Sequence, residues 1–332
     1  MTPKERVNAR LAGKPVDKIP NMNIFMAIIA REAGVSYRDF VLDYRNLVKG
    51  NLICVEKFGV DSVGVISESR ETAAYGANVI FPENTSPYSD PPLIGDDFDL
   101  SKIVLFDPLK HPRTLDRVKA CELLHEKAGT DYPVIGWIEG CLAQAAELRG
   151  VNNIMMDIAE EEAYLDDLIP MLHGPQKHFA KAQIDAGADI IGVGNSVASL
   201  VGPALYERYG LPWDKAVTEY IHSLGAKVKL HICGNITAIL PLIKQVEADI
   251  LDVDWMVDFA AAAKFFDGSK TAVNGNMDPV RVMMQGSLEE IEKQVNCCIN
   301  AGTSTTLISG GCEIPAATPD GNLLLMDKLL YR

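Results

Sequence analysis

The stretch KVKLHICGN, Lys227–Asn235, is a short hydrophobic run that ends in a histidine, a cysteine and a Gly-Asn break. Strands of a parallel sheet are buried on both faces, so they form such runs instead of alternating polar and apolar residues. Eight runs of this kind recur along the chain: KIPNMNIF (18–25), DSVGVIS (61–67), YPVIGWIEG (132–140), ADIIGVGN (188–195), KVKLHICGN (227–235), ADILDVDW (248–255), KTAVNGN (270–276) and TTLISGG (305–311). Helical patterns separate most of them, for example at 163–187, 203–225 and 288–302. This alternation predicts an α/β fold, a TIM (β/α)8 barrel that forms one domain over residues 1–332.

An open, doubly wound α/β sheet is the alternative fold for the same alternation. Its usual mark is a glycine-rich loop that follows an early strand and binds the phosphates of a dinucleotide. The sequence GVGNSV at 192–197 supplies the first two glycines of that pattern, but Val197 stands where the third is required. The barrel is therefore the fold that we expect.

One segment interrupts the alternation after the second predicted strand. Residues 73–100, AAYGANVIFPENTSPYSDPPLIGDDFDL, are rich in Pro, Asn, Asp and aromatic residues. This length and composition predict an inserted loop or hairpin. In a barrel such an insertion lies over the carboxyl ends of the strands, where lids and binding loops are found. A plain surface excursion is the alternative.

Composition and charge narrow the class of protein. The chain has 332 residues, 48% of them hydrophobic, and a formal net charge of −14. A surface this acidic repels phosphate backbones, so nucleic acid is not an expected partner. No run reaches the ~18 apolar residues of a membrane span and no hydrophobic leader opens the sequence, so we expect a cytoplasmic protein without membrane contact. The seven scattered cysteines favour metal binding or catalysis over a disulfide framework.

Polar residues stand at the ends of the predicted strands. Chemistry in a barrel belongs at the carboxyl ends of its strands, and charged groups beside a core need partners or a metal. The polar residues at these ends are Glu139, Asn195, His231, Cys233, Asp252, Asp254, Asn274, Asn276 and Cys312. From this placement alone, Glu139, Asn195 and Asn276 are candidates for positioning a substrate.

His231 and Cys233 are separated by one residue, so on a strand their side chains leave the same face, roughly 6.6 Å apart at Cα. A core cysteine beside a hydrogen-bonded histidine is one interpretation of this pair. Cys312 adds a second sulfur just after the eighth predicted strand, where Gly310 and Gly311 permit a sharp turn. One imidazole and two thiolates with an open fourth position are typical of a catalytic zinc site. His231, Cys233 and Cys312 are therefore the predicted zinc ligands and catalytic residues.

Asp254 is the candidate for a fourth zinc ligand. It shares one face of the sixth predicted strand with Asp252 and stands nearer the end of that strand. In this role its carboxylate would hold the metal at rest and yield to the substrate. A supporting role, in which the carboxylate makes structural hydrogen bonds or orients a ligand, is equally consistent with the sequence.

The motifs HICGN, VDW, NGNMDP and GGCEIPAATPDGN, together with YGANVIFPENTSPYSDPPL, carry a family resemblance over essentially the whole chain. The chain resembles the uroporphyrinogen decarboxylase superfamily, and within it the zinc-dependent corrinoid methyltransferases, which include the methylcobalamin:coenzyme M enzymes. In that branch a His-x-Cys pair and a distant cysteine bind zinc, and these correspond to His231, Cys233 and Cys312. Cobalamin-independent methionine synthase, a more distant relative, adds an acidic ligand on the following strand, where this chain has Asp254.

The resemblance implies a methyltransferase that uses zinc and a corrinoid, or cobalamin, carried on a partner protein. The methyl group would pass between the corrinoid and a small acceptor, for which a thiol such as coenzyme M is the first candidate. Related enzymes instead demethylate a small compound, such as an aryl methyl ether, onto the corrinoid. The residues leave both directions open.

Two other functions compete with this one. Metal-free uroporphyrinogen decarboxylases bind the porphyrin carboxylates with an early arginine-rich motif, whereas the corresponding segment here, NMNIFMAIIAREAG at 21–34, has only Arg31. A cage for eight carboxylates is hard to build without those arginines on a protein of charge −14, so we disfavour this function. A non-catalytic accessory protein would keep the barrel and bind metal or a corrinoid partner without turnover.

Overall fold

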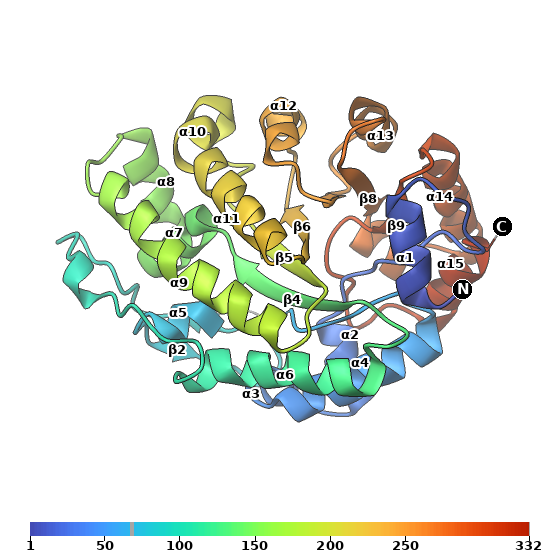
Figure 1. Cartoon of the computed structure of the whole chain (residues 1–332), viewed down its shortest axis with the longest axis horizontal. Coiled ribbons are helices and arrows are strands. Elements are labelled where there is room, and N and C mark those ends of the chain that lie inside the picture. The colour runs from blue at the N-terminus through green and yellow to red at the C-terminus, as the bar shows by residue number, and fades with distance from the viewer. Residues whose placement is uncertain (67–69, 332) are drawn as a thin grey trace.

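The computed structural model describes residues 1–66 and 70–331. Its main sheet has seven parallel strands, in the order β1-β4-β5-β6-β7-β8-β9, and helices surround the curled sheet (Figure 1). The strands are β1 (Val63–Gly64), β4 (Val134–Glu139), β5 (Ile190–Gly194), β6 (Lys227–Ile232), β7 (Ile250–Val253), β8 (Ala272–Met277) and β9 (Leu307–Gly310). The predicted α/β barrel in a single domain is confirmed.

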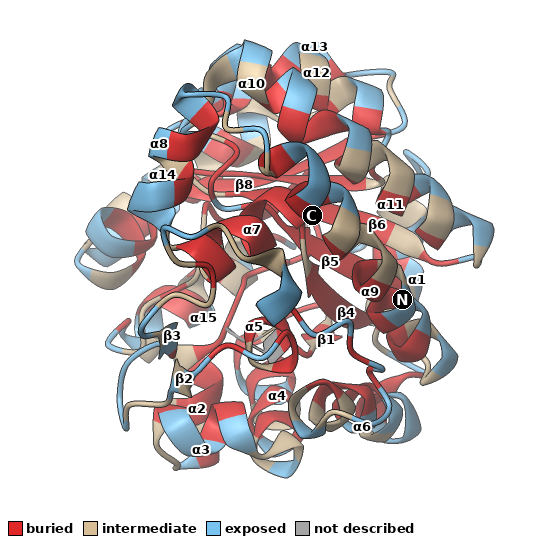
Figure 2. Cartoon of the chain, turned by 90° about the vertical axis from the view of Figure 1, so that its left-hand side faces the viewer, coloured by how far each residue is buried: buried red, intermediate tan, exposed pale blue. Residues whose placement is uncertain are grey.

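Helices follow the strands and cover their outer side. In chain order they are α1 (Pro3–Leu11), α2 (Ala27–Ala33), α3 (Tyr37–Leu42), α4 (Tyr44–Phe58), α5 (Arg70–Ala74), α6 (Pro112–Ala128), α7 (Cys141–Arg149), α8 (Val151–Ala159), α9 (Leu165–Asp185), α10 (Gly202–Tyr209), α11 (Leu211–Ser223), α12 (Leu240–Ile243), α13 (Phe259–Phe266), α14 (Leu288–Ala301) and α15 (Asp320–Leu329). Short helical turns are η1 (Leu100–Lys102), η2 (Thr237–Ile239), η3 (Lys244–Val246) and the π-helix η4 (Pro279–Met284). Buried residues concentrate in the central strands, as the red ribbon of Figure 2 shows. Among the described residues, no helix has both the length and the apolar character needed to cross a membrane.

The first predicted strand, residues 18–25, does not form a regular strand. The segment makes only isolated bridges, such as the one between Asn21 and Ile308 of β9. Its backbone nevertheless joins the two edges of the sheet, because Met22 N donates to Ile308 O and Asp61 N, just ahead of β1, donates to Asn21 O. An extended segment thus takes the position of the eighth barrel strand.

Side chains explain why this segment lacks a ladder. Pro20 has no N–H to donate. Further along, Gly310 N of β9 donates to the side-chain Oδ1 of Asn23 at 2.7 Å instead of to a backbone carbonyl. The pairing between this segment and β9 is therefore shared between backbone and side chain, and it falls short of a regular strand.

Helix α1 covers the amino-terminal end of the barrel. Val7 packs in a buried cluster with residues near the starts of β4, β5 and β7. Arg6 forms an ion pair with Asp61 at 2.5 Å, and Lys4 forms one with Asp189, just ahead of β5, at 2.8 Å. With this end closed, the carboxyl ends of the strands form the mouth of the barrel.

The inserted segment 73–100 contains the predicted hairpin. Strands β2 (Val79–Ile80) and β3 (Tyr88–Ser89) pair antiparallel, with Val79 opposite Ser89. The hairpin follows α5 in the chain. Residues 86–89 and Pro92 border the same pocket as the strand-end residues of the barrel, so the insertion lies at the mouth.

Candidate metal centre

Strands β6 and β9 bring one imidazole and two thiols together at the mouth. His231 is the last residue but one of β6, Cys233 follows the strand directly, and Cys312 comes two residues after β9. Cys233 Sγ lies 3.3 Å from His231 Nε2 and 3.8 Å from Cys312 Sγ, and Cys312 Sγ lies 3.8 Å from His231 Nε2. Among the described residues, this is the group of His, Cys, Asp and Glu side chains close enough to share a metal ion.

The spacing of these three atoms fits zinc. A tetrahedral zinc with Zn–S bonds of about 2.3 Å and Zn–N bonds of about 2.0–2.1 Å separates two sulfurs by about 3.8 Å, and a sulfur from a nitrogen by about 3.6 Å. The three separations in the structure agree with these values to within about 0.3 Å. His231, Cys233 and Cys312 therefore fit three corners of a tetrahedral site and leave the fourth corner for another ligand.

Two glycines allow the sulfurs to approach each other. Gly234 has φ +85°, a left-handed conformation that turns the chain directly after Cys233. Gly311, directly before Cys312, packs against the backbone of the loop after β7, where an added Cβ would lie 2.3 Å from Trp255 N. A side chain at Gly311 would thus push the loop that carries Cys312 away from the mouth.

The pKa values of the two thiols shift in opposite directions. The hydrogen bond with Cys233 lowers the pKa of Cys312 to about 4, with further help from His231, although burial works against ionisation. The same contact, together with burial, raises the pKa of Cys233 far above its ordinary value, because Cys233 keeps the proton that it donates to the Cys312 sulfur. The pair therefore carries negative charge at neutral pH, as a site for a cation requires.

The inner side of His231 faces a buried charged cluster. His231 Nδ1 lies 3.3 Å from Asp252 Oδ2, somewhat off the direct hydrogen-bond line, and Asp252 also contacts Lys229 Nζ and accepts from Asn274 Nδ2 at 2.7 Å. Burial opposes ionisation of Asp252, but the Lys229 ammonium outweighs it and lowers the pKa of Asp252 to about 2. Burial would lower the pKa of His231, yet Asp252 and Cys312 raise it to about 9. Nδ1 faces the carboxylate, so Nε2 is the nitrogen turned toward the sulfurs.

The ligand candidates lie in the wall of a pocket of about 510 Å³. The barrel contributes Trp137, Glu139, Asn195 and the three ligand candidates. The insertion contributes residues 86–89, and Glu313 follows Cys312 in the same wall. A pocket of this size suits a small molecule, and it brings that molecule against the sulfur pair.

Glu139 lies in this wall, at the end of β4. Its Oε1 accepts a hydrogen bond from Trp137 Nε1 at 2.9 Å, and its backbone N donates to Glu71 Oε1 at 3.0 Å. The Trp137 ring in turn lies 6.2 Å from the His231 ring, centroid to centroid. The structure therefore places Glu139 where the sequence predicts a residue that positions substrate, and this role stays a prediction.

Asn195 also borders the pocket, but it is fully buried at the end of β5. Its Nδ2 donates to both carboxylate oxygens of Asp214, at 3.2 and 2.9 Å, and Tyr206 donates to the same carboxylate at 2.8 Å. Burial raises the pKa of Asp214 to about 6, although both hydrogen bonds stabilise its charged form. Asn195 is thus held by hydrogen bonds to the buried carboxyl group of Asp214 behind the pocket wall.

Two predicted site residues lie apart from this arrangement. Asp254 is outside the group of ligand atoms, and its Oδ2 and Oδ1 accept from Gly234 N at 3.0 Å and Met256 N at 3.1 Å. Asn276 does not belong to the described pocket wall, and its Nδ2 donates to Asp254 O at 3.0 Å and Val257 O at 2.7 Å. Both side chains bond to backbone, which favours the supporting role for Asp254, while its role as a metal ligand stays a prediction.

Sequence reasoning missed several residues of the site. Trp137 looked like part of a buried strand, yet it joins Glu139 to the ring of His231. Lys229 stood unremarked in KVKLHICGN, although a lysine inside a strand that is buried on both faces must have a charged partner. That rule points to a carboxylate on a neighbouring strand, and in the structure this partner is Asp252.

The family model for uroporphyrinogen decarboxylase (URO-D) matches residues 2–330. The chain belongs to the URO-D family. The predicted superfamily is thereby confirmed, and the match leaves out only the first residue and the last two.

Within the URO-D family, relatives that match almost the whole chain carry the name of methyltransferases. The methylcobamide:CoM methyltransferase MtbA of Methanosarcina mazei is 27% identical over 332 residues, 98% of this chain and 96% of its own. MtaA of Methanosarcina barkeri, which has the same description, is 25% identical over 330 residues, 97% and 95% of the two chains. The chloroplastic uroporphyrinogen decarboxylase 2 of Oryza sativa subsp. japonica is 26% identical over 244 residues, 66% of this chain and 61% of its own.

Solved structures share the URO-D barrel. A methyltransferase from Methanosarcina mazei superposes with a TM-score of 0.89 over 99% of this chain and 98% of its own, at 22% identity. A B12-independent methionine synthase from Shewanella sp. W3-18-1 reaches a TM-score of 0.55 over 85% of each chain, at 12% identity. At these identities the likeness establishes the fold.

Proposed function

We propose that this protein is a zinc-dependent methyltransferase that moves a methyl group between a corrinoid on a partner protein and a small acceptor. A thiol such as coenzyme M is the first candidate for the acceptor. The observation that carries the proposal is the spacing of His231 Nε2, Cys233 Sγ and Cys312 Sγ in the wall of a pocket of about 510 Å³. The full-length relatives named methylcobamide:CoM methyltransferases support it.

The chemistry matches the donor set. Zinc held by His231, Cys233 and Cys312 would keep an incoming thiol deprotonated and nucleophilic. The methyl group then passes by in-line displacement: a sulfur–carbon bond forms while the cobalt–carbon bond breaks, and the electron pair of that bond stays on cobalt. The chain itself supplies the pocket that orients the thiol and the negative sulfur pair that suits a cation.

The inserted segment 73–100 is the proposed docking lid for the corrinoid protein. The pocket accommodates a small molecule, so a corrinoid bound to another protein has to approach through the mouth. Residues 86–89 of the insertion form part of the pocket wall there, and Tyr88 is half exposed. The insertion thus contacts both the small substrate and the space in which the partner docks.

A metal-free decarboxylase is less consistent with the pocket. Arg31, which alone stands in the segment that corresponds to the arginine-rich motif, donates to Ala316 O and Thr318 O and pairs with Asp320. It is not part of the described pocket wall. That wall instead carries the carboxylates of Glu139, Glu147 and Glu313, which would repel a porphyrin with many carboxylates.

The test combines metal analysis with a methylcobalamin assay. We expect about one zinc per chain, and loss of the methylcobalamin absorbance on addition of a thiol from a panel that includes coenzyme M. Zinc-free protein after purification with zinc in the medium would refute the proposal. Protein that holds zinc but uses none of the thiols should be assayed in reverse, with methylated small molecules and unmethylated cobalamin. Failure in both directions would leave only the non-catalytic function.

A further inference from the structure

A lysine lies inside the barrel directly behind the candidate metal centre. Lys229 stands two residues before His231 on β6, so the two side chains leave the same face of the strand. Its side chain is 3% exposed, and Nζ contacts Asp252 Oδ2, whose side chain is 4% exposed. The same Oδ2 lies 3.3 Å from His231 Nδ1. One carboxylate oxygen therefore faces both the ammonium and the imidazole.

Burial of these charges needs a reason. The interior of a TIM barrel is normally filled by branched apolar side chains, and transfer of an ion pair from water to the interior is often no gain for stability. An apolar pair of the same volume would close the barrel equally well. The position of the pair, in contact with a residue of the metal centre, points to a role in that centre.

We propose that Lys229 is a positioning residue of the metal centre, which acts on His231 through Asp252. This inference rests on the zinc site proposed above. Lys229 Nζ contacts Asp252 Oδ2, and that carboxylate lies against the Nδ1 side of the imidazole, so Nε2 stays turned toward Cys233 and Cys312. Carboxylates that hold the far nitrogen of a histidine ligand fix its tautomer and raise its basicity.

The lysine also balances charge. Two sulfur ligands and a substrate thiolate exceed the charge of one zinc ion, and the carboxylate of Asp252 lies directly behind His231. Asn274 gives Asp252 a hydrogen bond at 2.7 Å but no charge, and an imidazole that binds zinc through Nε2 is neutral, so Lys229 is the lysine that contacts this carboxylate. Without Lys229, a carboxylate beside a zinc-bound, neutral His231 would be buried without a lysine to balance it.

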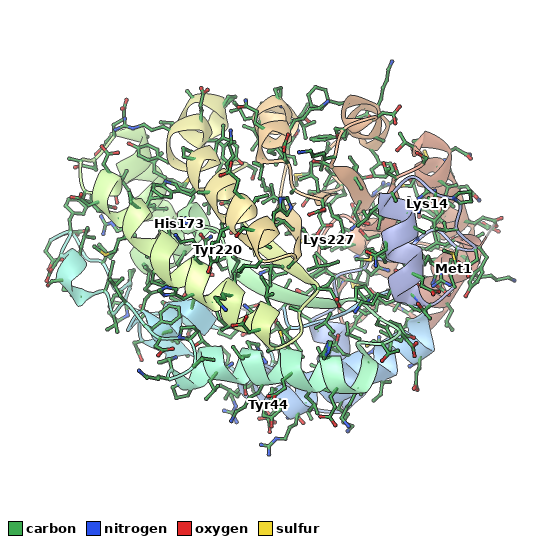
Figure 3. All side chains as sticks on the ribbon, viewed as in Figure 1. Met1, Lys14, Tyr44, His173, Tyr220 and Lys227 are labelled. Atoms are coloured by element: carbon green, nitrogen blue, oxygen red, sulfur yellow. The ribbon has the colours of Figure 1, made fainter. Side chains whose placement is uncertain are left out.

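The decisive variant removes both charges together. Lys229→Met/Asp252→Asn replaces the ion pair by a neutral pair, which avoids a lone buried charge and should fold. We expect its zinc affinity, measured by competition with a chelator, to fall about 10–100-fold. We also expect the absorption bands of the cobalt(II)-substituted protein to shift, because the field of the histidine ligand changes. Lys227→Met is the matched control: Lys227, labelled in Figure 3, lies two residues earlier on β6, is partly exposed, and should leave both readouts unchanged.

A second variant guards against loss of the fold. Lys229→Gln keeps a hydrogen-bond donor beside Asp252 but removes the charge, and its zinc affinity should fall in the same direction. A folded double variant or Lys229→Gln protein with the zinc affinity and cobalt spectrum of the wild type would overturn the inference. Should the wild-type protein itself bind no zinc, the proposed function fails instead, so the two failures are distinguishable.

Discussion

Two pairs of strand ends at the mouth behave differently. At the ends of β6 and β9, the polar atoms of His231, Cys233 and Cys312 face one another around a common point. At the ends of β7 and β8, the polar atoms of Asp254 and Asn276 bond to backbone groups of the loops. All five residues lie at or just past the carboxyl ends of strands, so position alone does not separate them. The difference shows that hydrogen-bonding partners separate side chains whose polar atoms could share a metal ion from side chains that hold loops.

The largest effect is expected at Cys312, because the proposed metal site at the ends of β6 and β9 requires its sulfur. Cys312→Ala removes one of three ligands, so the zinc content should drop from about one per chain to below about 0.1, and methyl transfer should be lost with it. Cys297→Ala, at an exposed position on α14, is the control and should keep both. Zinc measured by plasma emission on both proteins decides the point. Full occupancy in Cys312→Ala would contradict the assigned ligand set.

Asp254→Ala tests the other pair of strand ends. The change leaves the N–H groups of Gly234 and Met256 without their acceptor, and each such loss costs about 1–3 kcal/mol. We expect the free energy of unfolding in urea to fall by about 2–4 kcal/mol while the zinc content stays near one per chain. The opposite pattern, stable protein without zinc, would establish Asp254 as the fourth ligand.

Asp214, which holds Asn195 at the end of β5, should make the stability of the protein depend on pH. Its pKa is raised by burial from 3.8 to about 6 in the folded protein, so the folded state binds its proton more tightly than the unfolded chain does. Its contribution to stability is therefore complete below pH 3.8 and is lost as the pH rises through about 6, which amounts to about 3 kcal/mol. Asp214→Asn lacks this titration. We expect the stability difference between wild type and variant to shift by about 2 kcal/mol between pH 4 and pH 7 in urea unfolding, and parallel profiles would be evidence against it.

Glu139→Gln should have the smallest effect. Glutamine keeps the size of the side chain and an acceptor for Trp137 Nε1, but it removes a charge from the pocket wall. We expect KM for the small substrate to change about 2–10-fold with no change in zinc content, since one hydrogen bond contributes about 0.5–1.5 kcal/mol. Glu126→Gln, exposed on α6, is the matched control. A loss of zinc in Glu139→Gln would move Glu139 into the metal centre.

The sequence predicts most of the fold because buried parallel strands leave a strong pattern. Seven of the eight hydrophobic runs hold strands of the main sheet: 61–67 contains β1, and the six runs from 132–140 to 305–311 coincide with β4 to β9. The run at 18–25 has the same composition, yet Pro20 and the side chain of Asn23 change its pairing with β9. When a side chain replaces a backbone carbonyl as the hydrogen-bond acceptor, the hydrophobic pattern of the sequence does not reveal it.

The site is predictable to the extent that it depends on chemistry at strand ends. One histidine and two cysteines at such ends predict a group that the structure brings within bonding distance of a common point. Asp252 and Asp254 cannot be told apart in this way, because both stand on one face of β7 and its end. In the folded chain, Asp252 contacts Lys229 and His231, whereas Asp254 accepts a hydrogen bond from the backbone of Gly234. The different roles of the two aspartates therefore become visible only in the structure.

The closed end of the barrel has a practical consequence. Helix α1 covers that end, and Lys18 pairs with Tyr331 near the last residues, so both chain termini lie away from the mouth, as N and C in Figure 1 indicate. A tag or a surface anchor attached at either terminus therefore points the mouth toward solution. Protein immobilised in this way should remain open to a large partner, whereas a corrinoid domain fused to a terminus would need a linker long enough to pass around the whole barrel.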